Sequence, residues 1–238
     1  MKRFKRTRAA RTLAGALALL LILGLALLVD CFSGDPVSRA FANRRMLAWA
    51  NGQWPGHDFY IAEAFGGAAF TYDVRLQSSV SADTWFNVGS VLGLWRYTTD
   101  YEFQVEQGYN TCARLEQALA SAAASCLEQA AFSATYQPQV YVSLRAPGGQ
   151  SALPQGMELD MPYDPALAQQ AALSLQLATS GPPHTVQARA AAQDAKAALE
   201  AAGLSFARYE ITLRDKTVEY QHALETLVEA SFTAQELG

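Results

Sequence analysis

The feature that most constrains this chain is an apolar run near its N-terminus. Thr12–Val29 holds eighteen residues without a charge, nine of them Leu, between a basic stretch and Asp30. At about 1.5 Å per residue, a helix of this length spans roughly 27 Å, close to the roughly 30 Å of a bilayer's hydrocarbon core. We therefore predict a single N-terminal transmembrane helix that acts as an uncleaved signal anchor.

The basic stretch sets the orientation expected for this anchor. Six Lys and Arg residues lie between Lys2 and Arg11, and such residues are retained in the cytoplasm. The predicted location is the bacterial cell membrane, with the N-terminus in the cytoplasm and the C-terminal domain outside. A cleaved signal peptide is one alternative, although its apolar region is normally about 7–15 residues. A lipoprotein signal is another, although it places a small residue before the cysteine, where this chain has Asp30.

Charge and cysteine content limit what the remainder can bind. The part beyond residue 29 carries all 22 Asp and Glu but only 12 of the 18 Lys and Arg. This acidic balance argues against nucleic acid, whose binding depends on basic patches that release counterions. Three cysteines do not form a disulfide scaffold, and we expect Cys112 and Cys126 to be small hydrophobes within one helix. The role of Cys31 and the oligomeric state stay open.

Periodicity predicts an α+β fold. Asp35-Pro36 opens a helix that ends near Gln53, and alternating apolar residues from Phe59 to Val88 predict a three-stranded antiparallel meander, followed by a long helix over 101–131. We expect the first helix and this long helix to cover the apolar face of the sheet, because such a face needs a partner layer. The predicted core consists of Phe41, Leu47, Ile61, Phe70, Tyr72, Val74, Phe86 and a stripe of small residues over Val105–Ala130.

A second α/β portion follows. Strands are predicted around Val140–Leu144 and Leu173–Leu177, then an Ala-rich helix that Gly203 closes. A C-terminal hairpin is expected from Phe206–Asp215 and Thr217–Leu224, whereas 226–237 fits either a strand or a helix. The expected organisation is 1–34 for the tail, anchor and spacer, 35–133 for the helix-meander-helix portion, and 134–238 for the second portion, which can pack with the first as one ectodomain.

Several stretches resemble a known family. These are Gly34-Asp35-Pro36-Val37-Ser38, Thr71-Tyr72-Asp73-Val74, Ser81-Ala82-Asp83-Thr84-Trp85-Phe86-Asn87-Val88, and the helix start Tyr101–Leu115 with Asn110 and Arg114. Over roughly the first 115 residues the chain resembles the YfjL-like family of membrane-anchored Firmicutes proteins. That family has no assigned activity, so the resemblance implies a fold and a location but no catalytic residues.

The predicted meander contains one group of polar residues that could form a binding site. The sequence has no glycine-rich phosphate loop, no nucleophile elbow and no helical histidine pair, so we predict no catalytic, cofactor-binding or metal-binding residues and no cofactor. A possible recognition site is formed by Asp73, Arg75, Asp83, Thr84 and Trp85, with Tyr60 and Trp95 as flanking aromatic residues. Alternatively, Asp83 only fixes the turn before its strand. A Ca²⁺ site formed by Glu63, Asp73 and Asp83 is the weakest alternative, because no loop offers successive ligands.

These observations predict a non-enzymatic, membrane-tethered extracytoplasmic module that binds a protein or an envelope component. One alternative is an extracytoplasmic envelope hydrolase, which needs two acids, or a nucleophile and a base, converging in a pocket. The other is a structural subunit that acts through its membrane helix.

Overall fold

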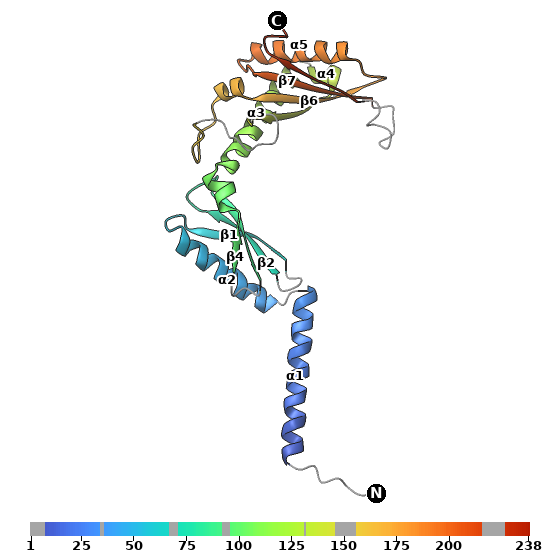
Figure 1. The fold of residues 1–238 in the computed structure, drawn as a ribbon. Coiled ribbons are helices and arrows are strands. Elements are labelled where there is room, and N and C mark those ends of the chain that lie inside the picture. The colour runs from blue at the N-terminus through green and yellow to red at the C-terminus, as the bar shows by residue number, and fades with distance from the viewer. Residues whose placement is uncertain are drawn as a thin grey trace. The chain divides into compact units, whose positions relative to one another are not determined.

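The fold consists of two separate α+β units, as a computed structural model shows for residues 8–33, 36–66, 71–91, 96–130, 132–145, 156–215 and 227–238. The units are Met1–Val105 and Glu106–Gly238, and each contains one four-stranded sheet. Figure 1 shows the helices and strands of each unit. The predicted α+β class is confirmed, whereas the division falls at 105/106 and not at the expected 133/134.

The N-terminal run forms helix α1 (Arg8–Ser33), and the side chains of Leu13, Leu17, Leu19, Leu20, Leu21, Leu23, Leu25 and Leu28 are exposed. Among the residues that the structure describes, however, no helix is both long enough and apolar enough to cross a membrane. A crossing needs about 20 consecutive apolar residues, whereas the charge-free run Thr12–Val29 within α1 has eighteen. The prediction of a transmembrane signal anchor, and with it of a single-pass membrane protein, is therefore wrong. The predicted location stays a prediction.

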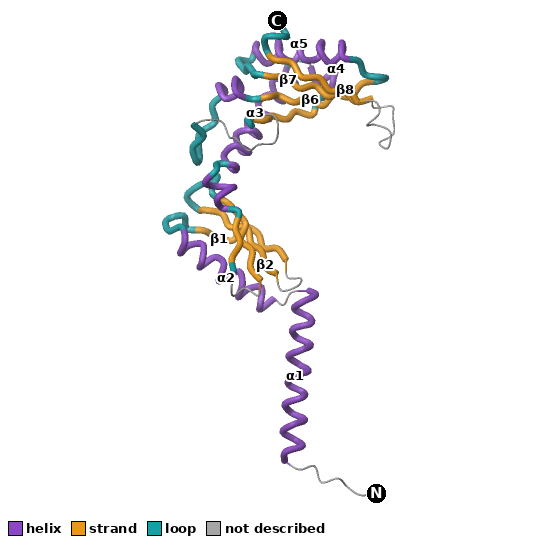
Figure 2. Tube along the Cα trace, viewed as in Figure 1, coloured by secondary structure: helices purple, strands orange, loops and turns teal. Residues whose placement is uncertain are grey.

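The first unit is an antiparallel meander covered on one face by a helix. Helix α2 (Pro36–Gln53) precedes strands β1 (Phe59–Gly66), β2 (Thr71–Ser78), β3 (Trp85–Val91) and β4 (Tyr97–Thr99), which pair in that order. Figure 2 shows α2 beside these strands. Helix α2 packs on β1, β2 and β3, and a π-helical turn, η1 (Glu102–Glu106), follows β4. The predicted three-stranded meander is confirmed, and β4 extends it by a short strand.

Burial confirms the predicted sheet face but not the predicted face of α2. Tyr72, Val74 and Phe86 are buried in the core as expected. Helix α2 turns Ala42, Met46 and Ala50 toward the sheet, whereas Phe41 is 51% exposed and Leu47 and Ile61 are only half-buried. The prediction of Phe41 in the core is wrong, because small residues let the helix approach the sheet closely and Trp54 fills the space near Phe86 and Tyr101. Phe70 lies outside the described residues.

The second unit is a mixed sheet with helices on one face. Its helical elements are α3 (Tyr109–Gln129), α4 (Phe132–Tyr136), η2 (Pro165–Gln170) and α5 (Thr185–Ala201), and its strands are β5 (Gln139–Ser143), β6 (Ala172–Thr179), β7 (Arg208–Asp215) and β8 (Leu227–Thr233). Strands β6 and β7 are parallel and joined through α5, whereas β5 and β8 pair antiparallel at the two edges.

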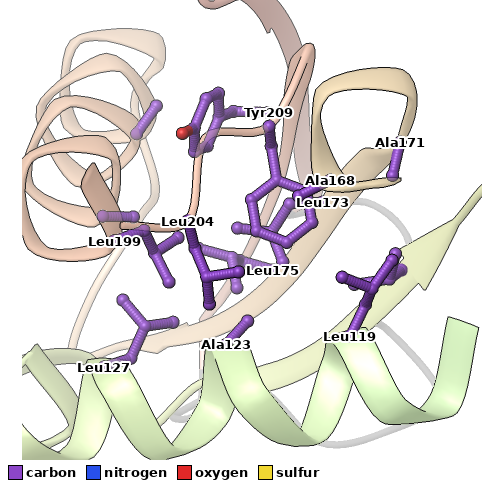
Figure 3. Close-up of a cluster of buried hydrophobic side chains, with 14 of the residues drawn as sticks. Leu119, Ala123, Leu127, Ala168, Ala171, Leu173, Leu175, Leu199, Leu204 and Tyr209 are labelled. Carbon is purple, nitrogen blue, oxygen red and sulfur yellow. The ribbon is translucent and has the colours of Figure 1, made fainter. Parts of the chain in front are cut away.

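The core of this unit lies between the helices and the sheet. Leu119 and Leu127 of α3 point toward Leu173 and Leu175 of β6, and Leu199, Leu204 and Tyr209 belong to the same buried cluster (Figure 3). Helix α3 contacts β5 and α5, so the expectation that the long helix covers the meander is wrong for α3, whereas Tyr101 and Val105 before it pack in the core of the first unit. Within the predicted stripe, Val105, Cys112 and Leu119 are buried, but Ala130 is exposed. The deeply buried positions of α3 run through Leu115, Ala123 and Leu127 instead.

The C-terminal hairpin forms with a later second strand than expected. Strand β7 matches the predicted first strand, and its antiparallel partner is β8, with Ile211 opposite Ala230. The predicted strand Thr217–Leu224 lies outside the described residues. A helix over 226–237 is excluded by β8, since Val228 and Phe232 alternate along a strand and pack on the core.

Candidate functional site

The face of the first sheet that α2 does not cover carries three of the predicted recognition residues. Burial alternates along β2 and β3, so Val74 and Phe86 face the core while Asp73, Arg75 and Trp85 lie on the open face. Pairing places Gln77 opposite Trp85 and Arg75 opposite Asn87. The sequence therefore predicted correctly that Asp73, Arg75 and Trp85 share a face. Their role in recognition stays a prediction.

Arg75 is the centre of this face. Its guanidinium carbon lies 5.5 Å from the ring centroid of Phe65 and 5.3 Å from that of Trp85, both within cation–π distance. Its Nη1 donates to Glu63 Oε2 at 3.3 Å, and the two side chains are 41% and 54% exposed. At such exposure the ion pair adds little stability. We call Glu63, Phe65, Asp73, Arg75 and Trp85 the Arg75 cluster.

A β-bulge brings Phe65 into the cluster. The register between β1 and β2 shifts between Ile61 and Glu63, so one extra residue reverses which side chains face the core beyond it. Phe59 and Ile61 consequently face α2, whereas Phe65 lies opposite Asp73 on the open face. Simple alternation from Phe59 and Ile61 places Phe65 in the core. The sequence therefore did not predict Phe65 on the open face beside Arg75. The interruption of alternation by Ala62, Glu63 and Ala64 was the available signal.

Gly89 makes room for the carboxylate of Asp73. Gly89 lies opposite Asp73 in β3, and a Cβ atom there would approach Asp73 Oδ1 to 2.5 Å and Thr98 Oγ1 to 2.9 Å. Real Cβ contacts are longer, so the Asp73 side chain occupies the space that any other residue at position 89 would fill.

The turn before β3 holds the other two predicted residues away from the open face. Asp83 is 2% exposed and Thr84 is fully buried. The Ser81 hydroxyl lies 2.6 Å from Thr84 Oγ1 and accepts from Thr84 N at 3.0 Å, while Gln77 Nε2 donates to the carbonyl oxygens of residues 81 and 82. These bonds fix the turn around Asp83, and the role of Asp83 itself stays a prediction.

The three acids considered for catalysis or Ca²⁺ occupy different environments. Glu63 is paired with Arg75 and Asp73 lies over Gly89, both on the open face, whereas Asp83 is buried in the turn. Within the described parts of the chain, no group of three or more His, Cys, Asp or Glu residues is placed to hold a metal. Tyr60 is 49% exposed beside the cluster, and Trp95 lies outside the described residues.

Comparison with known proteins adds no relative. No family model matches the chain, and neither a curated protein nor a solved structure does. The resemblance to the YfjL-like family stays a prediction.

Proposed function

We propose that this chain is a non-enzymatic binding module that recognises a protein partner through the Arg75 cluster. The observation that carries the proposal is an arginine held between two aromatic rings on an uncovered sheet face. Arg and the aromatic residues are enriched in the energetically dominant centres of protein interfaces. Asp83 lies apart from Glu63 and Asp73, so the three acids considered for a hydrolase do not meet at one place.

Preorganisation supports the same assignment. The Arg75 guanidinium is held in place by Phe65, Trp85 and Glu63. Because this side chain is already ordered, binding a partner costs less conformational entropy. Arg75 has five N–H donors, and its one hydrogen bond within the described chain comes from Nη1. The half-exposed guanidinium can therefore donate to carbonyl or carboxylate oxygens of a partner.

Affinity capture with the tagged full-length chain from an extract of its native host tests the proposal. The recovered proteins are compared for the unchanged chain, Arg75→Ala, Trp85→Ala and the control Arg96→Ala, whose side chain is also exposed. We expect a specific protein whose recovery falls at least tenfold with the first two variants and stays within twofold for the control. Equal recovery with Arg75→Ala, while circular dichroism shows a folded chain, would refute the proposal.

A further inference from the structure

Helix α2 presents a second apolar surface on the side away from its sheet. Val37 is 75% exposed and Phe41 is 51% exposed, and positions 37, 41, 44 and 48 recur at helical spacing. The opposite side of α2 is already used, since Ala42, Met46 and Ala50 pack on the sheet. This surface is therefore separate from the Arg75 cluster, which lies on the uncovered face of the same sheet.

The exposed side of α2 is basic as well as apolar. The helix has no acidic residue, and its exposed side carries Arg44 and Arg45, although the whole chain has an excess of acids, 22 against 18. Arg44 and Arg45 are exposed, and no residue in the described ranges forms an ion pair with either. The Arg45 guanidinium carbon lies 5.7 Å from the ring centroid of Phe41, so positive charge borders the exposed ring.

A cleft adjoins these residues. It has a volume of about 440 Å³ and is lined by Ala40, Phe41, Asn43, Arg44, Leu47 and Ile61. The lining is mainly apolar, with one arginine at its side. Such a cleft accepts an apolar side chain from a partner whose neighbouring residues are negatively charged.

We propose that the cleft of α2 binds an acidic, amphipathic segment of a second protein, which inserts one large apolar side chain beside Phe41 and pairs its carboxylates with Arg44 and Arg45. Charge complementarity selects this occupant, because Arg44 and Arg45, on a helix without an acid, repel a basic partner and gain no ion pair from a neutral partner. Apolar insertion supplies affinity, and the carboxylate pairs supply orientation and on-rate. The first unit would then contact two partners, through α2 and through the Arg75 cluster.

Fluorescence anisotropy with the full-length chain tests this surface. The probe is a labelled 16-residue amphipathic helical peptide of Glu and Leu with one central Trp, compared with the same peptide in which Lys replaces every Glu. The variants are Phe41→Ala, the double variant Arg44→Glu/Arg45→Glu, and the control Arg96→Glu, which reverses an exposed arginine elsewhere in the same unit. We expect the acidic peptide to bind more tightly than the basic peptide, with salt-dependent affinity.

The expected Kd rises at least tenfold for Phe41→Ala and for the double variant, and less than twofold for Arg96→Glu. Equal affinity for both peptides, or equal losses in the double variant and the control, would overturn the proposal. Sedimentation showing that the α2 surface joins two copies of the chain would also overturn it, as would binding to anionic vesicles without binding to the acidic peptide. The variants Arg75→Ala and Trp85→Ala should leave this binding unchanged, which separates it from the proposed function.

Discussion

The thiol of Cys112 lies fully buried in the second unit, beside a buried carboxylate. Glu116 accepts hydrogen bonds from Leu144 N at 2.9 Å and from Arg145 Nη2 at 3.0 Å, and the guanidinium carbon of Arg145 lies 4.7 Å from the ring centroid of Tyr109. Burial raises the pKa of the Cys112 thiol from its ordinary value of 9.0 to about 12, and the charge of Glu116 adds to the increase. The thiol is thus held in its protonated form.

This raised pKa predicts a loss of stability at alkaline pH. The protonated thiol favours the folded state fully below pH 9, and this contribution is lost as pH rises from about 9 toward 12, because only the unfolded chain ionises there. At pH 10 the loss is about 1.4 kcal/mol. We expect urea unfolding between pH 8 and pH 10 to show a shallower decline for Cys112→Ala than for the unchanged chain.

Cys126→Ala provides the control, since Cys126 is a free thiol of the same helix that is only partly buried. We expect the free energy of unfolding of Cys126→Ala to fall between pH 8 and pH 10 about as steeply as that of the unchanged chain. The fall for Cys112→Ala should be shallower than both. Identical declines in all three proteins would show that Cys112 ionises in the folded state as readily as in the unfolded state.

Among the secondary-structure elements, β3 combines two roles on its two faces. Phe86 and Val88 are fully buried in the core, while Trp85 and Gly89 lie on the open face opposite Gln77 and Asp73. One strand therefore contributes to stability through one face and to the Arg75 cluster through the other. A change at Gly89 should affect the cluster more than the core.

We predict that Gly89→Ala displaces the Asp73 carboxylate and destabilises the first unit by about 1 kcal/mol, since the added methyl meets the ends of two side chains that can shift. Partner recovery through the Arg75 cluster should fall in the same variant. Gly52→Ala is the matched control, because a Cβ at Gly52 in α2 meets nothing within 4 Å. Thermal unfolding checks the two variants, and a Gly89→Ala protein as stable as Gly52→Ala would contradict the register of β2 and β3.

For the whole molecule, the main result is that the two units have separate cores. One buried cluster contains Met46, Val74 and Phe86, the other contains Leu119, Leu175 and Tyr209, and they share no residue. Each core has its own sheet and its own covering helices. Damage to one core is therefore expected to act mainly on its own unit.

Val74→Asp tests this expectation, because Val74 is fully buried and an unpaired buried charge costs several kcal/mol. Hydrogen exchange should show lost protection in β1, β2 and β3 while β6 and β7 remain protected. Val91→Asp introduces the same charge at a side chain that is 55% exposed and should leave both units protected. Loss of protection in β6 and β7 with Val74→Asp would show that the two cores unfold together.

The elements with a local sequence pattern could be predicted without the structure. Alternation along β2, β3 and β6 predicted both the strands and their buried faces, and Gly203 predicted the end of α5. The α+β class follows from these signals alone, because side-chain periods of 2.0 and 3.6 residues depend only on backbone geometry. The same local pattern predicted the helical state of α1, but not its relation to a membrane.

Tertiary structure decided what each face meets. Four features depend on residues distant in the chain. They are the side of α2 that packs on the sheet, the bulge that brings Phe65 to Arg75, the pairing of β8 with β7 and the packing of α3 on the second sheet. A periodic pattern shows that a face is apolar, but the partner layer is selected by shape and by close packing. That selection is a property of two surfaces together, so neither segment's sequence specifies it alone.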